Sequence, residues 1–164
     1  MKEGVIKMVT TFEMDYYNKN GRNSQNTSLS DYNCGGYALG TFNWYLPYES
    51  YEESTGALYF KHNMSVNEIA HYYENYLLSD FFETIRPIRS IDELAENEKA
   101  IAFRVGRDDF HFCVYKKDIG WYHKPGSNTI RKITTEEVFA DHWESPDGFV
   151  IYDSELILFA MKED

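Results

Sequence analysis

The sequence lacks the features of exported and membrane-anchored proteins. Its N-terminal stretch has no long apolar run after the first charged residues, which argues against a signal peptide or a membrane anchor. Only two cysteines, Cys34 and Cys113, occur in 164 residues. Disulfide-dependent secreted domains are much richer in cysteine, and a chain that is not exported stays where thiols are reduced. We therefore predict a cytoplasmic protein with two free thiols and no membrane partner.

Positive charge is also scarce. The chain has 16 Lys and Arg residues against 27 Asp and Glu residues, a formal net charge of −11. Such a surface repels phosphate backbones and anionic lipids, so nucleic acid is not an expected partner. There is no internal repeat, low-complexity segment or linker, and this length suits one domain. We predict a single domain over residues 1–164.

Helical periodicity and capping residues predict the helices. Apolar residues from Cys34 to Tyr45 fall on one helical stripe, which Pro47 ends. A capping box is a Ser or Thr followed three residues later by Glu, and it marks a helix start. Three such boxes precede apolar periods: Ser65–Glu68, Ser90–Glu93 and Thr134–Glu137. The helices after the first and the last box are expected to end near residues 80 and 142.

The strands are predicted from runs of β-branched and aromatic residues, most of them after residue 99. The expected strands are 5–12, Ala100–Val105, Phe110–Tyr115, Gly120–His123, Thr129–Ile133, Phe149–Tyr152 and Leu156–Met161. Helices first and a strand meander afterwards are typical of an α+β fold with a mostly antiparallel sheet.

Cys34 is a candidate nucleophile at the start of the first predicted helix, in Asp31-Tyr-Asn-Cys-Gly-Gly. A thiol in the first turn faces the positive end of the helix dipole and unpaired N–H groups, which favours the thiolate. The same N–H groups suit the oxyanion of a tetrahedral intermediate, and Gly35 lets a substrate backbone approach the sulfur. The alternative is a small thiol packed beneath the helix.

His111 is the candidate base. On a strand, His111 shares one face with Cys113 and Tyr115, while Phe110, Phe112 and Val114 share the other. A turn after Lys117 lets the next strand return, which brings His123 beside His111. An imidazole base needs a third group to fix its tautomer, and a histidine, asparagine or carboxylate can serve. The alternative for either ring is a structural histidine.

These segments resemble those of NlpC-type papain-like cysteine peptidases and amidases, including uncharacterised bacterial and phage members. Asn33-Cys-Gly-Gly-Tyr-Ala resembles their nucleophile segment, Asp-Cys-Ser-Gly or similar. His111-Phe-Cys-Val-Tyr and Gly120-Trp-Tyr-His123 resemble their His-Val-Gly-Ile-Tyr strand and the strand that returns beside it. The resemblance implies a papain-like fold in which the nucleophile helix packs on the sheet.

The same resemblance implies a cysteine hydrolase acting on an amide or isopeptide bond of a peptide or protein, without a cofactor. Cys34 would be the nucleophile, His111 the base and His123 the orienting residue, with Asn128 the next candidate for that role. Candidates for the oxyanion hole or substrate cleft are Gly35, Asn33, Tyr32 and Trp121.

The chain departs from the family pattern at three places. Asn33 replaces the usual acidic residue, Cys113 stands where glycine is common, and the interval between Cys34 and His111 is longer than usual. We expect the extra length, residues 46–85, to form an insertion or a lid.

Two other functions compete with the hydrolase. Cys34, His111, Cys113 and His123 are zinc-type ligands, but their spacing is not that of a zinc knuckle, so no metal is predicted. The second is an acidic binding or inhibitor protein of the kind that phages encode, without catalysis. The Tyr-rich stretch 44–60 would then anchor a partner, because aromatic clusters are common at interfaces.

Overall fold

A six-stranded sheet organises the computed structural model, which describes residues 19–23, 26–48 and 63–163. Its strand order is β1-β8-β2-β3-β4-β5, every neighbouring pair is antiparallel, and β6 and β7 form a separate two-stranded ribbon. The prediction of an α+β fold with a mostly antiparallel sheet is confirmed. The strands are β1 (Ile85–Ile88), β2 (Glu98–Val105), β3 (Phe110–Lys116), β4 (Gly120–His123), β5 (Arg131–Ile133), β6 (Trp143–Glu144), β7 (Ile151–Tyr152) and β8 (Ile157–Lys162).

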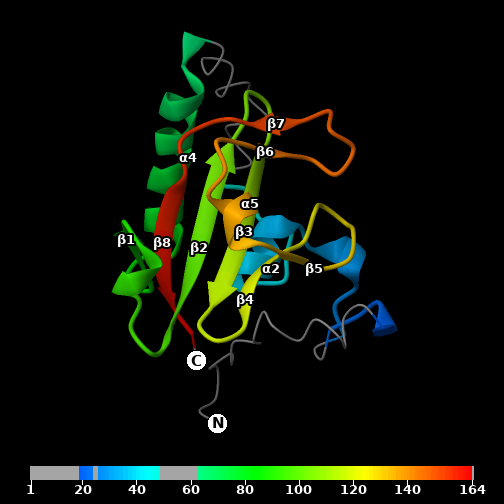
Figure 1. Ribbon diagram of the computed structural model, residues 1–164. Coiled ribbons are helices and arrows are strands. Elements are labelled where there is room, and N and C mark those ends of the chain that lie inside the picture. Colours follow the sequence, from blue (N-terminus) through cyan, green and yellow to red (C-terminus); the bar gives the residue numbers. More distant parts are fainter. Residues whose placement is uncertain (1–18, 24–25, 49–62, 164) are drawn as a thin grey trace.

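Helices cover both faces of the sheet. The helical elements are η1 (Leu29–Asp31), α2 (Cys34–Leu39), α4 (Val66–Asp80), η3 (Ile91–Glu93) and α5 (Thr135–Val138). The long helix α4 packs against β1 and β2, α2 packs against β3 and β4, and α5 packs against β4 (Figure 1).

The alternation of β3 divides the core in two. Phe112 and Val114 pack with α2 and α4 on one face, and Cys113 packs with Trp121 and Trp143 on the other. Because successive strand residues point to opposite faces, β3 supplies both cores. His111 belongs to the Cys113 side of this alternation.

The predicted capping boxes at Ser65, Ser90 and Thr134 are all present, but the helices that follow differ in length. Helix α4 ends at Asp80, as expected. The Ser90 box opens only a 3₁₀ turn, and α5 ends at Val138, short of the expected residue 142. Phe139 is 44% exposed, so extending this helix beyond Val138 would bury little additional apolar surface in the core.

The expectation that the nucleophile helix runs to Tyr45 is wrong, because α2 ends at Leu39. Gly40 adopts a left-handed conformation (φ 76°), and its N–H bonds to carbonyls of the last turn. The chain then folds back over Gly36, where a Cβ would lie 1.9 Å from the Asn43 carbonyl oxygen. Only glycine permits this close approach.

Parts of three predictions lie outside the described residues. They are the strand at 5–12, most of the Tyr-rich stretch and residues 49–62 of the expected insertion or lid at 46–85. Within the described part of that segment, α4 buries Ile69, Ala70, Tyr73 and Leu77 in the core. Strands β1 and β6 were not predicted. Across the described ranges, no helix has the length and apolarity to span a bilayer.

Candidate functional site

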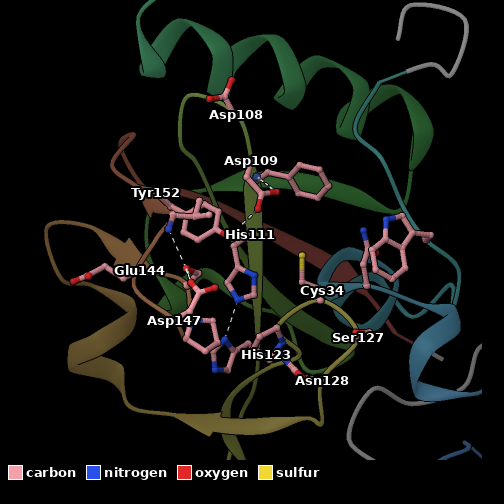
Figure 2. Close-up of a pocket in the computed structure, with 18 of the residues that line it drawn as sticks. Cys34, Asp108, Asp109, His111, His123, Ser127, Asn128, Glu144, Asp147 and Tyr152 are labelled. Carbon is pink, nitrogen blue, oxygen red and sulfur yellow. Dashed lines mark hydrogen bonds between the residues drawn. The ribbon is translucent and has the colours of Figure 1, made fainter. Parts of the chain in front are cut away.

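The three residues proposed for catalysis line one pocket. The cavity has a volume of about 540 Å³, and Cys34, His111 and His123 all contribute to its wall. Cys34 comes from α2 and the histidines from β3 and β4, so three elements meet there (Figure 2).

Asn33 fixes the start of α2 and hence the position of Cys34. Its Oδ1 accepts hydrogen bonds from the backbone N–H of Gly36 (2.9 Å) and of Tyr45 (3.0 Å). Its Nδ2 donates to the Tyr45 carbonyl (2.7 Å). A single buried side chain thus caps the helix and ties it to the returning chain.

The Cys34 sulfur is buried and receives backbone hydrogen bonds from Phe112, the neighbour of His111 on β3, and from Gly35. Both bonds favour the thiolate, but the stronger one comes from strand β3, and only the bond from Gly35 belongs to the helix N-terminus on which the prediction was based. Burial outweighs them and raises the pKa of Cys34 to about 12, and the nearby Asp109 carboxylate adds to the rise. The resting group is therefore a neutral thiol and not the thiolate that the helix-dipole argument favours.

His111 and His123 form a hydrogen-bonded pair. The His111 Nε2 atom lies 2.9 Å from the His123 Nδ1 atom, with the rings at 80° (Figure 2). The His111 ring also packs against Trp143 and Tyr152, at centroid distances of 5.8 and 5.6 Å. The predicted placement of His123 beside His111 is thus what the hairpin produces.

Both imidazoles are neutral at physiological pH. Burial, and secondarily the neighbouring ring, lowers the pKa of His111 to about 3. Burial is also the main cause that lowers the pKa of His123 to about 4. When both rings are neutral, the contact between the His111 and His123 nitrogens holds one proton, so one nitrogen donates and the other accepts.

Among the residues that the structure describes, no Lys or Arg lines the pocket. The charged side chains on its wall are the carboxylates of Asp108, Asp109, Glu144 and Asp147. The Tyr152 hydroxyl donates to the Asp109 carboxylate (3.1 Å), which holds that charge near Cys34. Trp44, 51% exposed, adds an aromatic surface. The pocket therefore suits a ligand with a positive charge.

Lys124 is a functional candidate that sequence reasoning missed, since Lys124-Pro-Gly126 has the composition of a turn. The side chain is fully buried, and its Nζ donates to the carbonyls of Tyr32 and Gly126 (2.5 Å each) and lies 4.6 Å from the Tyr32 ring centroid. Burial lowers its pKa to about 8, and its charge acts on Cys34 to favour the thiolate. No sequence signal marks a lysine for burial.

The other predicted site residues divide into two groups. Asn33 and Asn128 line the pocket. Tyr32 and Trp121 are buried in the core and, like the buried Gly35, are not among the residues that line it. Both cysteines are free thiols, with Cys113 fully buried beside the histidine pair.

The remaining described histidines are exposed and pair with carboxylates. His71 contacts Glu74 and Glu155, both at 2.7 Å, and His142 lies 3.3 Å from Glu144. Neither lines the pocket.

No protein-family model, curated protein or solved structure matches this chain. The site is therefore interpreted from its own geometry and chemistry.

Proposed function

We propose that this protein is a papain-like cysteine hydrolase that cleaves an amide or isopeptide bond with Cys34 as nucleophile, His111 as base and His123 as orienting residue. The observation that carries the proposal is the 2.9 Å contact between His111 and His123 in the pocket that also holds Cys34. A nucleophile, a base and a group that orients the base are the parts of such a triad.

The reaction is acyl transfer. His111 takes the proton from the Cys34 sulfur as the sulfur attacks the carbonyl carbon. The backbone N–H of Cys34, in the first turn of α2, is the candidate donor to the oxyanion. His111 then gives its proton to the amine as the C–N bond breaks, which leaves a thioester. Water, deprotonated by His111, hydrolyses the thioester and releases the acid and the free thiol.

Cys34 and His111 are both neutral in the resting protein, so the first proton transfer must charge both of them. Each pKa shift is the cost of charging one buried group alone, whereas proton transfer creates both charges together. Two opposite charges about 4 Å apart attract each other by about 4 kcal/mol at an effective dielectric constant of 20. The imidazolium donates its Nε2 proton to the Nδ1 atom of His123, and the Lys124 charge favours the thiolate.

The acidic wall favours a substrate with a positive charge near the scissile bond. The four carboxylates of the pocket attract such a group, and the exposed Trp44 ring offers it an aromatic face. Attack by an amine in place of water makes the same site a transglutaminase, and a glutamine side chain as substrate makes it a deamidase.

Labelling with a thiol electrophile tests this function. Iodoacetamide labelling followed by mass mapping is expected to modify Cys34 ahead of the fully buried Cys113. His111→Ala should slow labelling of Cys34, and His142→Ala, at an exposed histidine, is the matched control. Equal and sluggish labelling of the two thiols in wild-type protein would contradict the proposal.

A binding protein without catalysis is the second candidate. The observations that favour it are the burial of Cys34, which keeps the thiol neutral, and the exposed Trp44 at an acidic pocket. A basic partner would then occupy the pocket. An inert Cys34 together with tight binding of a basic protein that Trp44→Ala weakens would support this alternative.

A further inference from the structure

Three metal-ligating side chains converge on the face of the sheet that carries His111. His111, Cys113 and His123 each offer one ligand atom, and these atoms all lie within 4.8 Å of one another. The two histidine nitrogens of the pair are 2.9 Å apart. The hydrolase uses the two histidines and leaves Cys113 without a role.

The sheet register explains this convergence. His111 and Cys113 are two residues apart on β3 and share one face. Val114 pairs with Tyr122, and continuing this antiparallel register by one residue sets Cys113 opposite His123. The sequence argument against zinc was that the chain lacks the closely spaced ligand pairs of a zinc knuckle. Here the three ligands come from two paired strands, so no knuckle is needed.

We propose that His111, Cys113 and His123 form a binding site for Zn²⁺, with three protein ligands and an open fourth position. Imidazole nitrogen and thiolate sulfur are the ligands that Zn²⁺ prefers, and three protein ligands plus an open position are typical of sites that are not purely structural.

The geometry needs only small adjustments. Zn–N bonds of about 2.0–2.1 Å at a tetrahedral angle separate two imidazole nitrogens by about 3.3 Å. The His111–His123 contact of 2.9 Å must therefore widen by about 0.4 Å. Zn–S bonds of about 2.3 Å require a nitrogen–sulfur separation of about 3.6 Å. The ligand atoms lie within 4.8 Å of one another, so the Cys113 sulfur must approach each histidine nitrogen by about 1.2 Å at most.

The charges around the cluster are mixed. The Arg131 guanidinium lies near His123 and opposes a divalent cation, whereas the Glu137 carboxylate, near both His123 and Cys113, helps to balance one. The Arg104 guanidinium also acts on Cys113, where it favours the thiolate that zinc requires and opposes the cation. Binding releases the Cys113 thiol proton to solvent.

An ion can reach the cluster from the pocket, and a molecule in the pocket can occupy its fourth coordination position. His111 and His123 line the cavity, whereas Cys113 is fully buried and is not among the lining residues. An ion held by all three therefore presents its open position to the cavity, where water or a substrate carbonyl can bind.

Zinc at this site would inhibit the proposed hydrolase, a consequence that rests on the proposed function. The ion takes the Nε2 atom of His111 and the Nδ1 atom of His123, the two atoms of the orienting contact. It also removes the proton-accepting capacity of the pair. Metal binding itself does not depend on the hydrolase.

Titration of the metal-free full chain with Co²⁺, a spectroscopic substitute for Zn²⁺, tests the site. Wild-type protein should bind one Co²⁺ and show a thiolate-to-cobalt charge-transfer band, which excess Zn²⁺ abolishes. Cys113→Ser should lose the band. His123→Ala removes a ligand, so it should weaken Co²⁺ binding by more than the loss of about 10–100-fold that follows replacement of a residue that only supports a ligand. Cys34→Ser and His142→Ala should behave as wild type.

Two results would overturn the inference: no band with wild-type protein, or a band that survives Cys113→Ser and disappears in Cys34→Ser. The His123→Ala variant keeps the test informative if Cys113→Ser does not fold, because unchanged Co²⁺ affinity would also count against the site.

The rate of Cys34 alkylation with and without Zn²⁺ separates the two proposals. Zinc bound through Cys113 beside an inert Cys34 would leave the metal site standing and remove the hydrolase. A reactive Cys34 in a chain that binds no Co²⁺ would do the opposite.

Discussion

Replacement of His123 probes the contact on which the proposed triad depends. In the resting protein, His123→Ala leaves the buried Nε2 atom of His111 without its partner at 2.9 Å. A buried polar group that loses its partner costs about 1–3 kcal/mol, so the variant should remain folded with a modest loss of stability.

The effect on reactivity should be larger than the effect on stability suggests. When His111 takes the Cys34 proton it becomes an imidazolium, and its hydrogen bond to His123 becomes charge-assisted. Hydrogen bonds to charged groups contribute about 1.5–3 kcal/mol. At about 1.36 kcal/mol per tenfold in rate, their loss corresponds to a rate about 10- to 150-fold lower.

The assay is the second-order rate constant for alkylation of Cys34, measured in excess chelator so that no metal occupies the histidines. His123→Asn and His123→Gln should retain part of the rate, because either amide oxygen accepts the proton of His111. His123→Leu should be as slow as His123→Ala. A folded His123→Ala variant with the wild-type rate would refute the orienting role.

Three further substitutions test the surroundings of the site and the core. Asn33→Asp should destabilise the protein by about 1–3 kcal/mol in chemical denaturation, because the carboxylate cannot donate to the Tyr45 carbonyl that Asn33 Nδ2 now reaches at 2.7 Å. Gly36→Ala should abolish soluble folded protein, since its Cβ would lie 1.9 Å from the backbone oxygen of Asn43; a wild-type melting temperature would contradict this. Burial lowers the pKa of Lys99 from 10.5 to about 8, a cost of about 3 kcal/mol to the folded state at pH 7. Between pH 8 and 10.5 Lys99 holds more protons in the unfolded state, so its contribution to stability rises with pH, and Lys99→Met, which also removes the contact with Glu163 at 3.7 Å, should remove this contribution in parallel denaturation curves.

The part of the site built on strands was predictable from the sequence. A period of two places His111 and Cys113 on one face, and the short interval before Gly120 requires a tight hairpin. Asp118 and Gly120 adopt positive φ angles of 68° and 110° in that turn, which lets β4 return directly beside β3. Local pattern and turn chemistry together therefore fix His123 next to His111.

The part that depends on distant contacts was not predictable. The apolar stripe beyond Leu39 satisfies helical spacing, but Gly40 ends the helix in a left-handed conformation and the chain returns so that the backbone of Asn43 packs against Gly36. Likewise, Lys124 is buried because it meets carbonyls of Tyr32 and Gly126, one of them far away in sequence. The burial of Lys124 is decided by tertiary contacts and leaves no local signal, whereas the early end of α2 does have one in Gly40, which competes with the apolar stripe beyond it.

The same distinction explains the asparagine before the proposed nucleophile, where the papain-like family proposed for this chain has an acidic residue. A helix N-terminus accepts Asn or Asp equally well, because either oxygen caps the N–H of Gly36. In this chain the early end of α2 brings the backbone of Tyr45 against the cap, with its N–H and its carbonyl both facing residue 33. Only a side chain that accepts and donates satisfies both groups, and an amide does so where a carboxylate cannot. Asn33 is thus the residue that the short helix requires, so its departure from the family pattern has a structural cause and leaves the proposed chemistry of Cys34 intact.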